Sequence, residues 1–285
     1  MEINKHINFL VQDQAELLAY FEQNNITFDK YLDIITLDIY ESNEHWPTIE
    51  QYVKRSEKQG GRKITVLSNT IFSKQELDSA EYFFVRSIWR NGYPQPLDDN
   101  KYKKGITYSD DNACSKCGLD LKQIDSFRLE KRPKWGRRHF YMLNWVPDEF
   151  FVDEVAKNML EKSGLSGFSF RSAKNRSGKE VFDNVWQLNI PTVLPKGIIT
   201  ENSTAIRQIW VCPECGKPKY TGSGIGMYKY KKETFNNAPD FSRTYEHFGW
   251  GYGMCQNIVI NNKVYKFLTE NQLDKCLEFR PIELV

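Results

Sequence analysis

Hydrophobic and polar positions in the first part of the chain follow two periods, which predicts strands alternating with helices. Apolar residues at every second position indicate a strand, and a spacing of three to four indicates a helix. Residues 46–58 have the helical spacing, with Pro47 suited to the first turn. Ser73 and Glu76 form a capping-box pattern, which predicts a helix running to about Trp89. The other expected elements are strands near residues 7–11, 31–40 and 63–67 and a helix over residues 14–21.

These elements predict a small α/β sandwich over residues 1–92, and their alternation suggests a ferredoxin-like arrangement. Gly92, Pro94 and Pro96 follow, together with a polar stretch. This composition predicts a linker over residues 93–107. The rest of the chain, residues 108–285, is the second expected domain, and the fold class of the whole chain is therefore α+β.

The second domain contains an expected internal repeat, in which a CxxCG motif is followed by a helix and a strand. The two copies span residues 114–170 and 212–279, and apolar positions recur in both with the spacing of a one-sided helix. These positions are Val152, Ala156, Met159 and Leu160 in the first copy, and Ile260, Val264, Phe267 and Leu268 in the second. The shared order of motif, helix and strand predicts a duplicated helix–strand domain.

Four cysteines carry the clearest chemical signal in the sequence. They form the pairs Cys114–Cys117 and Cys212–Cys215, each with a two-residue gap and a following glycine. Such a gap lets both thiolates of a tight turn face one ion, and the glycine frees the backbone to turn. Two pairs provide the four sulfur ligands of a structural zinc site, which leaves no open position for water or substrate. We therefore expect one structural zinc ion per chain.

The long separation between the pairs does not argue against this site. There are 94 residues between Cys117 and Cys212, whereas compact zinc ribbons have about 15–20 residues between their cysteine pairs. The longer loop adds roughly 1.5 kcal/mol of closure entropy, against a zinc-binding free energy on the order of 10–16 kcal/mol. A redox-active CxxC pair, a disulfide and unligated thiols are the alternative uses of these cysteines.

Charge is distributed unevenly along the chain and suggests two kinds of partner. Residues 1–100 carry 10 basic and 16 acidic side chains, a net charge of −6, and the remainder carries 29 basic and 21 acidic side chains, a net charge of +8. Basic and aromatic residues are interleaved over residues 128–138 and 217–232, which could bind nucleic acid. A solvated surface is the simpler interpretation, because the pI of about 8.1 is below the value above about 9 that is typical of dedicated nucleic-acid binders.

Candidate partner-binding residues come from these segments and from an aromatic stretch near residue 247. They are Arg128, Lys134, Trp135, Arg137, Tyr228, Lys229, His247 and Trp250. Tyr220 and Tyr230 are further candidates for stacking on bases, and Trp135 and Trp250 are candidate anchors for a protein partner. Glu246 and His247 are adjacent, which is weak evidence for acid–base chemistry.

The sequence contains no recognisable catalytic constellation, so we expect a protein that binds rather than an enzyme. No apolar run approaches the ~20 residues needed to span a bilayer, and the N-terminus does not resemble a secretion signal. The expected location is the cytoplasm, and no membrane partner is expected.

The two CxxCG motifs, the helix–strand repeat and the ending Leu277-Glu-Phe-Arg-Pro-Ile-Glu-Leu-Val285 resemble the bacterial double-CXXCG family over about residues 108–285. That family is similar to immunity-type proteins of polymorphic and contact-dependent toxin systems, which bind and neutralise a toxin. The resemblance maps the family's motif cysteines onto Cys114, Cys117, Cys212 and Cys215. It implies a zinc-stabilised cytosolic protein with a protein partner such as a toxin, and it leaves residues 1–92 unexplained.

Overall fold

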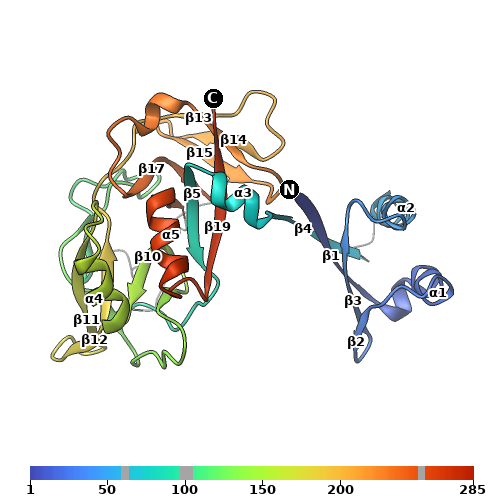
Figure 1. Cartoon of the computed structure of the whole chain (residues 1–285), viewed down its shortest axis with the longest axis horizontal. Helices are drawn as coiled ribbons and strands as arrows, with labels where there is room; N and C mark the ends of the chain where they lie inside the picture. The colour runs from blue at the N-terminus through green and yellow to red at the C-terminus, as the bar shows by residue number, and fades with distance from the viewer. Residues whose placement is uncertain (59–63, 97–104, 250–253) are drawn as a thin grey trace. The chain divides into compact units, whose positions relative to one another are not determined.

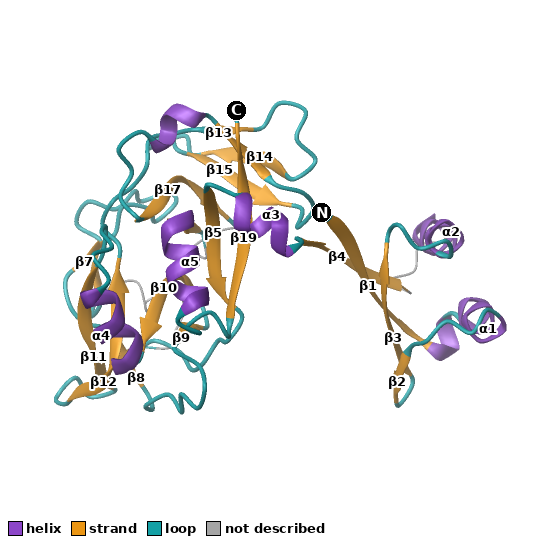
Figure 2. Cartoon of the chain, viewed as in Figure 1, coloured by secondary structure: helices purple, strands orange, loops and turns teal. Residues whose placement is uncertain are grey.

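The computed structural model describes residues 1–58, 64–96, 105–249 and 254–285, which divide into two compact units. Unit 1 comprises Met1–Glu76 together with Ser223–Gly226, and unit 2 comprises Leu77–Gly222 and Met227–Val285. The structure is mixed α and β and consists mostly of sheet (Figure 2). No helix in the described ranges is long and apolar enough to cross a membrane.

Unit 1 is a four-stranded sheet whose helices lie on one face (Figure 1). Its elements are β1 (Glu2–Leu10), the short 3-10 helix η1 (Val11–Asp13), α1 (Ala15–Gln23), β2 (Asp29–Tyr31), β3 (Ile34–Tyr40), α2 (Trp46–Lys58) and β4 (Ile64–Ile71). The strand order is β2-β3-β1-β4, and every neighbouring pair is antiparallel. Ile7 and Phe9 of β1 alternate with more exposed residues and pack with Phe21 of α1 and Ile49 of α2. This alternation buries one face of the sheet beneath the helices.

Unit 2 contains an eight-stranded sheet, a five-stranded sheet and a two-stranded ribbon. The eight strands, in spatial order, are β13 (Ile198–Ile199), β16 (Tyr228–Tyr230), β19 (Leu277–Leu284), β5 (Tyr82–Ser87), β18 (Cys255–Asn261), β17 (Phe241–Phe248), β15 (Pro218–Gly222) and β14 (Ile206–Val211). The five are β8 (Arg128–Leu129), β11 (Ser169–Asn175), β12 (Val181–Asn189), β10 (Val146–Val152) and β9 (Phe140–Leu143), and the ribbon pairs β6 (Tyr108–Ser109) with β7 (Lys122–Gln123). The remaining helices are α3 (Lys74–Ser79), at the boundary between the units, α4 (Glu154–Lys162), η3 (Lys232–Phe235) and α5 (Asn262–Glu270).

The five-stranded sheet and five neighbouring strands of the larger sheet have matching topologies. In the order β8-β11-β12-β10-β9, the first pair is parallel and the other three are antiparallel. The order β16-β19-β5-β18-β17 has the same pattern. A helix follows the fourth strand in each case, and its N-cap side chain accepts a backbone hydrogen bond: Asp153 from Ala156 and Asn261 from Val264. Both helices pack into one hydrophobic core that also contains residues of both sheets.

The segment from Ser73 to Trp89 differs from its sequence prediction. The capping box is present, because the backbone N–H groups of Ser73 and Glu76 each donate to the other residue's side chain. The predicted helix is nevertheless wrong after Ser79, because the chain continues as strand β5. Phe83 and Phe84 on that strand are buried in different cores on its two faces. The division between units accordingly falls after Glu76 rather than near residue 92.

Candidate metal centre

The four cysteines lie on two turns of the same construction, each between two paired strands. Cys114 and Cys117 lie between β6 and β7, and Cys212 and Cys215 lie between β14 and β15. In each turn the first cysteine's N–H donates to the carbonyl five residues ahead, and its carbonyl accepts from the glycine that follows the second cysteine. Those glycines, Gly118 and Gly216, have φ values of 67° and 68°. This conformation suits glycine and is the backbone turn that the CxxCG pattern predicted.

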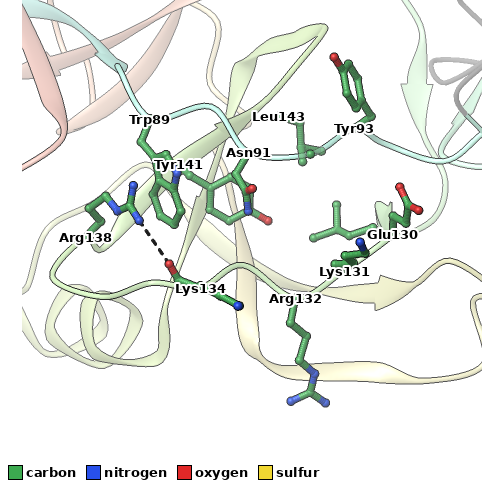
Figure 3. Close-up of a pocket in the computed structure, with 12 residues that line it drawn as sticks. Trp89, Asn91, Tyr93, Glu130, Lys131, Arg132, Lys134, Arg138, Tyr141 and Leu143 are labelled. Atoms are coloured by element: carbon green, nitrogen blue, oxygen red, sulfur yellow. Dashed lines mark hydrogen bonds between the residues drawn. The ribbon is translucent and has the colours of Figure 1, made fainter.

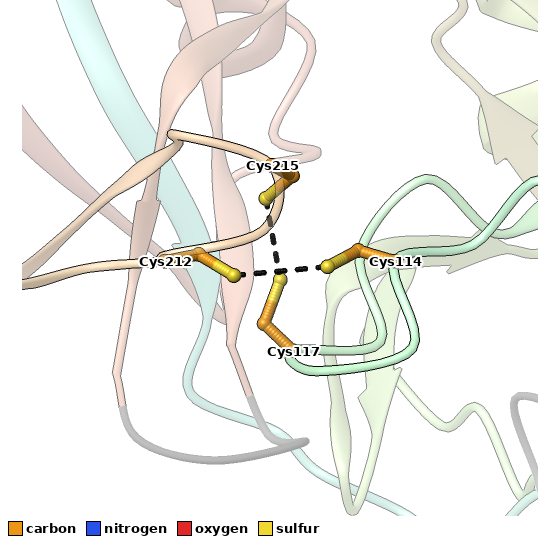
Figure 4. A group of neighbouring side chains, drawn as sticks. All are labelled: Cys114, Cys117, Cys212 and Cys215. Atoms are coloured by element: carbon orange, nitrogen blue, oxygen red, sulfur yellow. Dashed lines mark hydrogen bonds between the residues drawn. The ribbon is translucent and has the colours of Figure 1, made fainter.

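The two turns bring all four sulfur atoms together, as Figure 4 shows. The Sγ atoms of Cys114 and Cys212 are 3.7 Å apart, those of Cys117 and Cys215 are 3.6 Å apart, and all four lie within 4.8 Å of one another. Four sulfurs at 2.3 Å from a tetrahedral zinc ion would be about 3.8 Å apart. The cluster could therefore hold a metal ion.

Burial and hydrogen bonding act on the thiols in opposite directions. Leu119 and Met254 cover the group from the protein side. Burial raises the pKa of the Cys117 thiol to about 12. At Cys212 burial also acts to raise the pKa, but backbone N–H groups of Cys215 and Glu214, with neighbouring thiols, lower it to about 6. These contacts therefore favour the thiolate at Cys212, the form that binds metal.

Polar contacts outside the cysteines also join the two turns. The Glu214 carboxylate accepts from the Ser115 hydroxyl (2.6 Å) and from the Lys116 backbone N–H (3.1 Å). Lys217, after the second turn, donates to the carboxylate of Asp120, after the first. Sequence reasoning missed the roles of Glu214 and Asp120. Their only signal was an acidic residue inside or just after a CxxC motif.

The aromatic residues proposed to stack on bases are part of the protein interior. Tyr220, Tyr228 and Tyr230 are buried in one hydrophobic core, and the Tyr228 ring stacks on Phe248 with ring centroids 5.8 Å apart. Trp135 is half-buried, and its ring N–H donates to the carbonyl of Asn184. These side chains are committed to internal contacts, which corrects the expectation that they present free aromatic faces.

The remaining candidate partner-binding residues are dispersed. Arg128 contacts the carboxylate of Asp125, and Lys229 contacts that of Glu283. Lys134 and Arg137 are exposed on the connection between β8 and β9. The other proposed anchor, Trp250, lies outside the described residues. In the described part of the chain, the buried tyrosines do not form one surface with these charged residues.

His247 lies on the wall of a cavity of about 600 Å³, which Leu119 and Met254 also line. Burial, reinforced by the positive charges of Lys219 and Lys217, lowers the pKa of His247 to about 4. Its neighbour Glu246 points elsewhere: the carboxylate accepts from the backbone of Gly197 and Ile198 and from Tyr230. The adjacent pair therefore does not form an acid–base site.

The sequence analysis also missed a buried ion pair that lines this cavity. Arg243 and Glu149 contact each other at 2.9 Å, and both side chains are less than a tenth exposed. Burial raises the pKa of Glu149 from its ordinary value, against the opposing effect of the Arg243 charge. Arg243 also donates to the carbonyls of Ile190 and Asp148, and Glu149 also accepts from Gln187. The pair therefore has a structural role in joining β17 to β10.

Comparison with known proteins does not assign this chain to a family. No protein-family model matches the sequence, and no curated protein matches it. The arrangement of the side chains is therefore the basis for assigning a function.

Proposed function

We propose that this protein is a non-catalytic, zinc-stabilised binding protein of the immunity type, which acts in the cytoplasm by holding a protein partner. The proposal of zinc stabilisation rests on the clustering of four thiols from two separate turns. A four-thiolate zinc site is coordinatively closed and contributes folding energy rather than chemistry. The cytoplasm suits it, since thiols remain reduced there.

We infer that unit 2 is an internal duplication and that the zinc ion joins its two halves. This inference rests on the matching strand topologies, the two similarly capped helices and the identical hydrogen bonding of the two cysteine turns. The middle strand of the five differs in origin between the halves. In the first half it is β12, which follows α4 and β11 in the chain. In the second half it is β5, which precedes both copies in the sequence. For unit 1, the order β2-β3-β1-β4 with antiparallel neighbours supports the ferredoxin-like arrangement.

The partner-binding surface that we propose is the hairpin between β2 and β3 in unit 1. Tyr31 and Leu32 are 76% and 75% exposed, and Ile34 is 43% exposed. Leu32 has a φ of 53°, a left-handed conformation that costs a residue with a branched side chain about 1–2 kcal/mol. Strain of this kind at an exposed apolar residue favours a role in recognition over one in folding. Exposed aromatic and aliphatic side chains of this kind are typical anchors of protein interfaces.

Charge indicates which partner chemistry would suit this hairpin. Asp29, Lys30 and Asp33 lie among its apolar residues and give the hairpin one net negative charge. Residues 1–76 carry 8 basic and 12 acidic side chains, a net charge of −4. Opposite charges across an interface speed association and select partners. We therefore propose a partner with an apolar pocket in a basic surface. Nucleic acid, the alternative considered from the sequence, loses support because the three tyrosines proposed to stack on bases are buried.

The test is to purify the tagged full-length chain from its native cells after nuclease treatment. Proteins that stay bound are identified and quantified by mass spectrometry. We expect one partner at about one copy per chain, with its recovery falling more than tenfold in a Tyr31→Ala/Leu32→Ala variant. The matched control is Ile124→Ala/Val181→Ala, which removes two apolar side chains of 55% and 54% exposure from unit 2.

Full recovery of the partner by the hairpin variant would contradict the proposed surface. Recovery of no protein partner after nuclease treatment would contradict the protein-binding function. The immunity role makes a separate demand: the partner should slow growth when expressed by itself, and co-expression of this protein should restore growth. A partner that is harmless by itself would rule out that role while leaving the interaction intact.

A further inference from the structure

A second cavity, of about 310 Å³, lies in unit 2 and has no part in the proposed metal or partner sites (Figure 3). One wall comes from the segment after β5, with Trp89 and Tyr93, and another comes from the connection between β8 and β9. Tyr141 and Leu143 of β9 also line it. The volume is at the lower end of the range of about 300–1,000 Å³ for small-molecule sites.

Tyr141 carries a polar group with no partner in this cavity wall. Its side chain is fully buried, stacked on Phe151 and in edge contact with Trp135. Its hydroxyl has no hydrogen-bond partner among the described residues, and burial raises its pKa well above the ordinary value. A buried hydroxyl without a partner is unfavourable, and such groups call for an explanation. A bound ligand with a polar atom would provide one.

The rest of the lining is strongly cationic. Lys131, Lys134 and Arg138 line the cavity, and within the described part of the chain none of them contacts a carboxylate. The Arg138 guanidinium lies over the Trp89 ring, 3.8 Å from the ring centroid. The guanidinium also donates to the carbonyls of Trp135 and Lys134. These contacts fix the position of the planar group, and the charge has no carboxylate partner among the described residues.

Two other charged residues of the lining do not remove this excess. Arg132 is compensated by Glu180 and Asp183, which hold its guanidinium at 3.0 and 2.8 Å. Glu130 is the acidic residue among the lining side chains. The cavity therefore presents more positive than negative charge to a ligand.

We propose that this cavity binds a small phosphate monoester that carries a polar ring, of the size of a mononucleotide. The phosphate would lie between Lys134 and Arg138, and Lys131 adds positive charge farther along the wall (Figure 3). Lysine and arginine are the common phosphate-binding side chains. The ring would lie against the apolar side chains of the lining. Protein atoms fully cover the Tyr141 hydroxyl, so a ring nitrogen or oxygen would bond it after a small movement of the neighbouring side chains. This site is independent of the partner surface on unit 1.

Isothermal titration of the full-length, zinc-loaded protein tests the proposal with adenosine, guanosine, cytidine and uridine 5′-monophosphates. Inorganic phosphate and the four nucleosides are the reference ligands. We expect at least one monophosphate to bind at least tenfold more tightly than inorganic phosphate and its own nucleoside. Equal affinity for phosphate and all four monophosphates would overturn the proposal, because it would indicate an adventitious anion site.

Two variants connect such binding to this cavity. Tyr141→Phe should weaken the monophosphate about tenfold, the value of one hydrogen bond in a buried site, without lowering the melting temperature of the ligand-free protein. Lys131→Ala/Lys134→Ala should weaken it further and flatten its salt dependence. The matched control is Lys266→Ala, an exposed lysine on α5 that does not line the cavity.

Unchanged affinity in both variants would place the ligand elsewhere and overturn the assignment. A single-stranded oligonucleotide that binds far more tightly than every mononucleotide would also overturn it, in favour of a nucleic-acid surface.

Discussion

At the scale of single residues, the two cysteine turns are already joined before an ion is considered. Glu214 of one turn accepts hydrogen bonds from Ser115 and Lys116 of the other. Lys217 and Asp120 form a second link. These contacts lie near the surface, where ion pairs contribute about 0–1 kcal/mol. They can set the register of the turns, but a bound ion would supply most of the energy that holds them together.

His247 leads to a prediction about stability and pH. Its pKa of about 4 in the folded protein is below the ordinary value of about 6.5. The unfolded chain therefore binds a proton at a pH where the folded protein does not. The resulting stabilisation is complete above about pH 6.5, is lost as the pH falls towards 4, and amounts to about 3 kcal/mol.

The measurement is the free energy of unfolding in urea at a series of pH values for the wild type and His247→Asn. We expect the stability advantage of the wild type to shrink as the pH falls from about 6.5 to about 4. Taking the difference between two proteins with the same cysteines cancels the effect of thiol protonation. His6→Asn is the control, at a half-buried histidine in unit 1 that contacts Asp38. A difference independent of pH would show that His247 titrates normally.

At the scale of elements, β5 shows what local sequence patterns can and cannot predict. The capping box at Ser73 correctly predicted the start of a helix. The residues after Ser79 are aromatic and β-branched and favour a strand. Their hydrogen-bonding partners, β18 and β19, lie near the other end of the chain. Local periodicity contains no information about such distant pairing, and the strand was missed for that reason.

The candidate site divides in the same way. The cysteine cluster was predictable because each turn is encoded within five consecutive residues. The proposed partner surface was not predictable in this way. A tyrosine beside lysines has the same local pattern whether its ring faces the solvent or the core. Tyr228 and Tyr230 alternate with Lys229 on β16, and this places both rings inside and the lysine outside. The Tyr141 cavity likewise depends on segments that only the fold brings together.

The position of β5 predicts where the chain can be cut. A fragment of residues 77–285 retains the strand between β18 and β19, so it should fold and bind zinc. A fragment of residues 93–285 lacks it and would leave both neighbours with unpaired backbone groups in a buried sheet, which is strongly unfavourable. We expect that fragment to be unfolded or aggregated by circular dichroism and size-exclusion chromatography. A well-folded 93–285 fragment would contradict the central role of β5.

At the scale of the whole molecule, the duplication that we propose would explain the long separation between the cysteine pairs. Each half of unit 2 contributes one turn, and a complete half lies between them in the chain. The four sulfurs meet only when both halves are folded and correctly placed. An ion at this position would couple the two halves into one cooperative unit, and unit 1, with its own core, would be independent of it.

The most direct test is to measure the zinc content of the purified protein together with its unfolding after chelation. We predict that elemental mass spectrometry will find one zinc ion per chain in the wild type and none in Cys212→Ser. Chelation and Cys212→Ser should each destabilise unit 2 by at least about 4–5 kcal/mol and leave the unfolding of unit 1 unchanged. A metal-free wild-type protein that unfolds at the same temperature as the zinc-loaded protein would contradict the account.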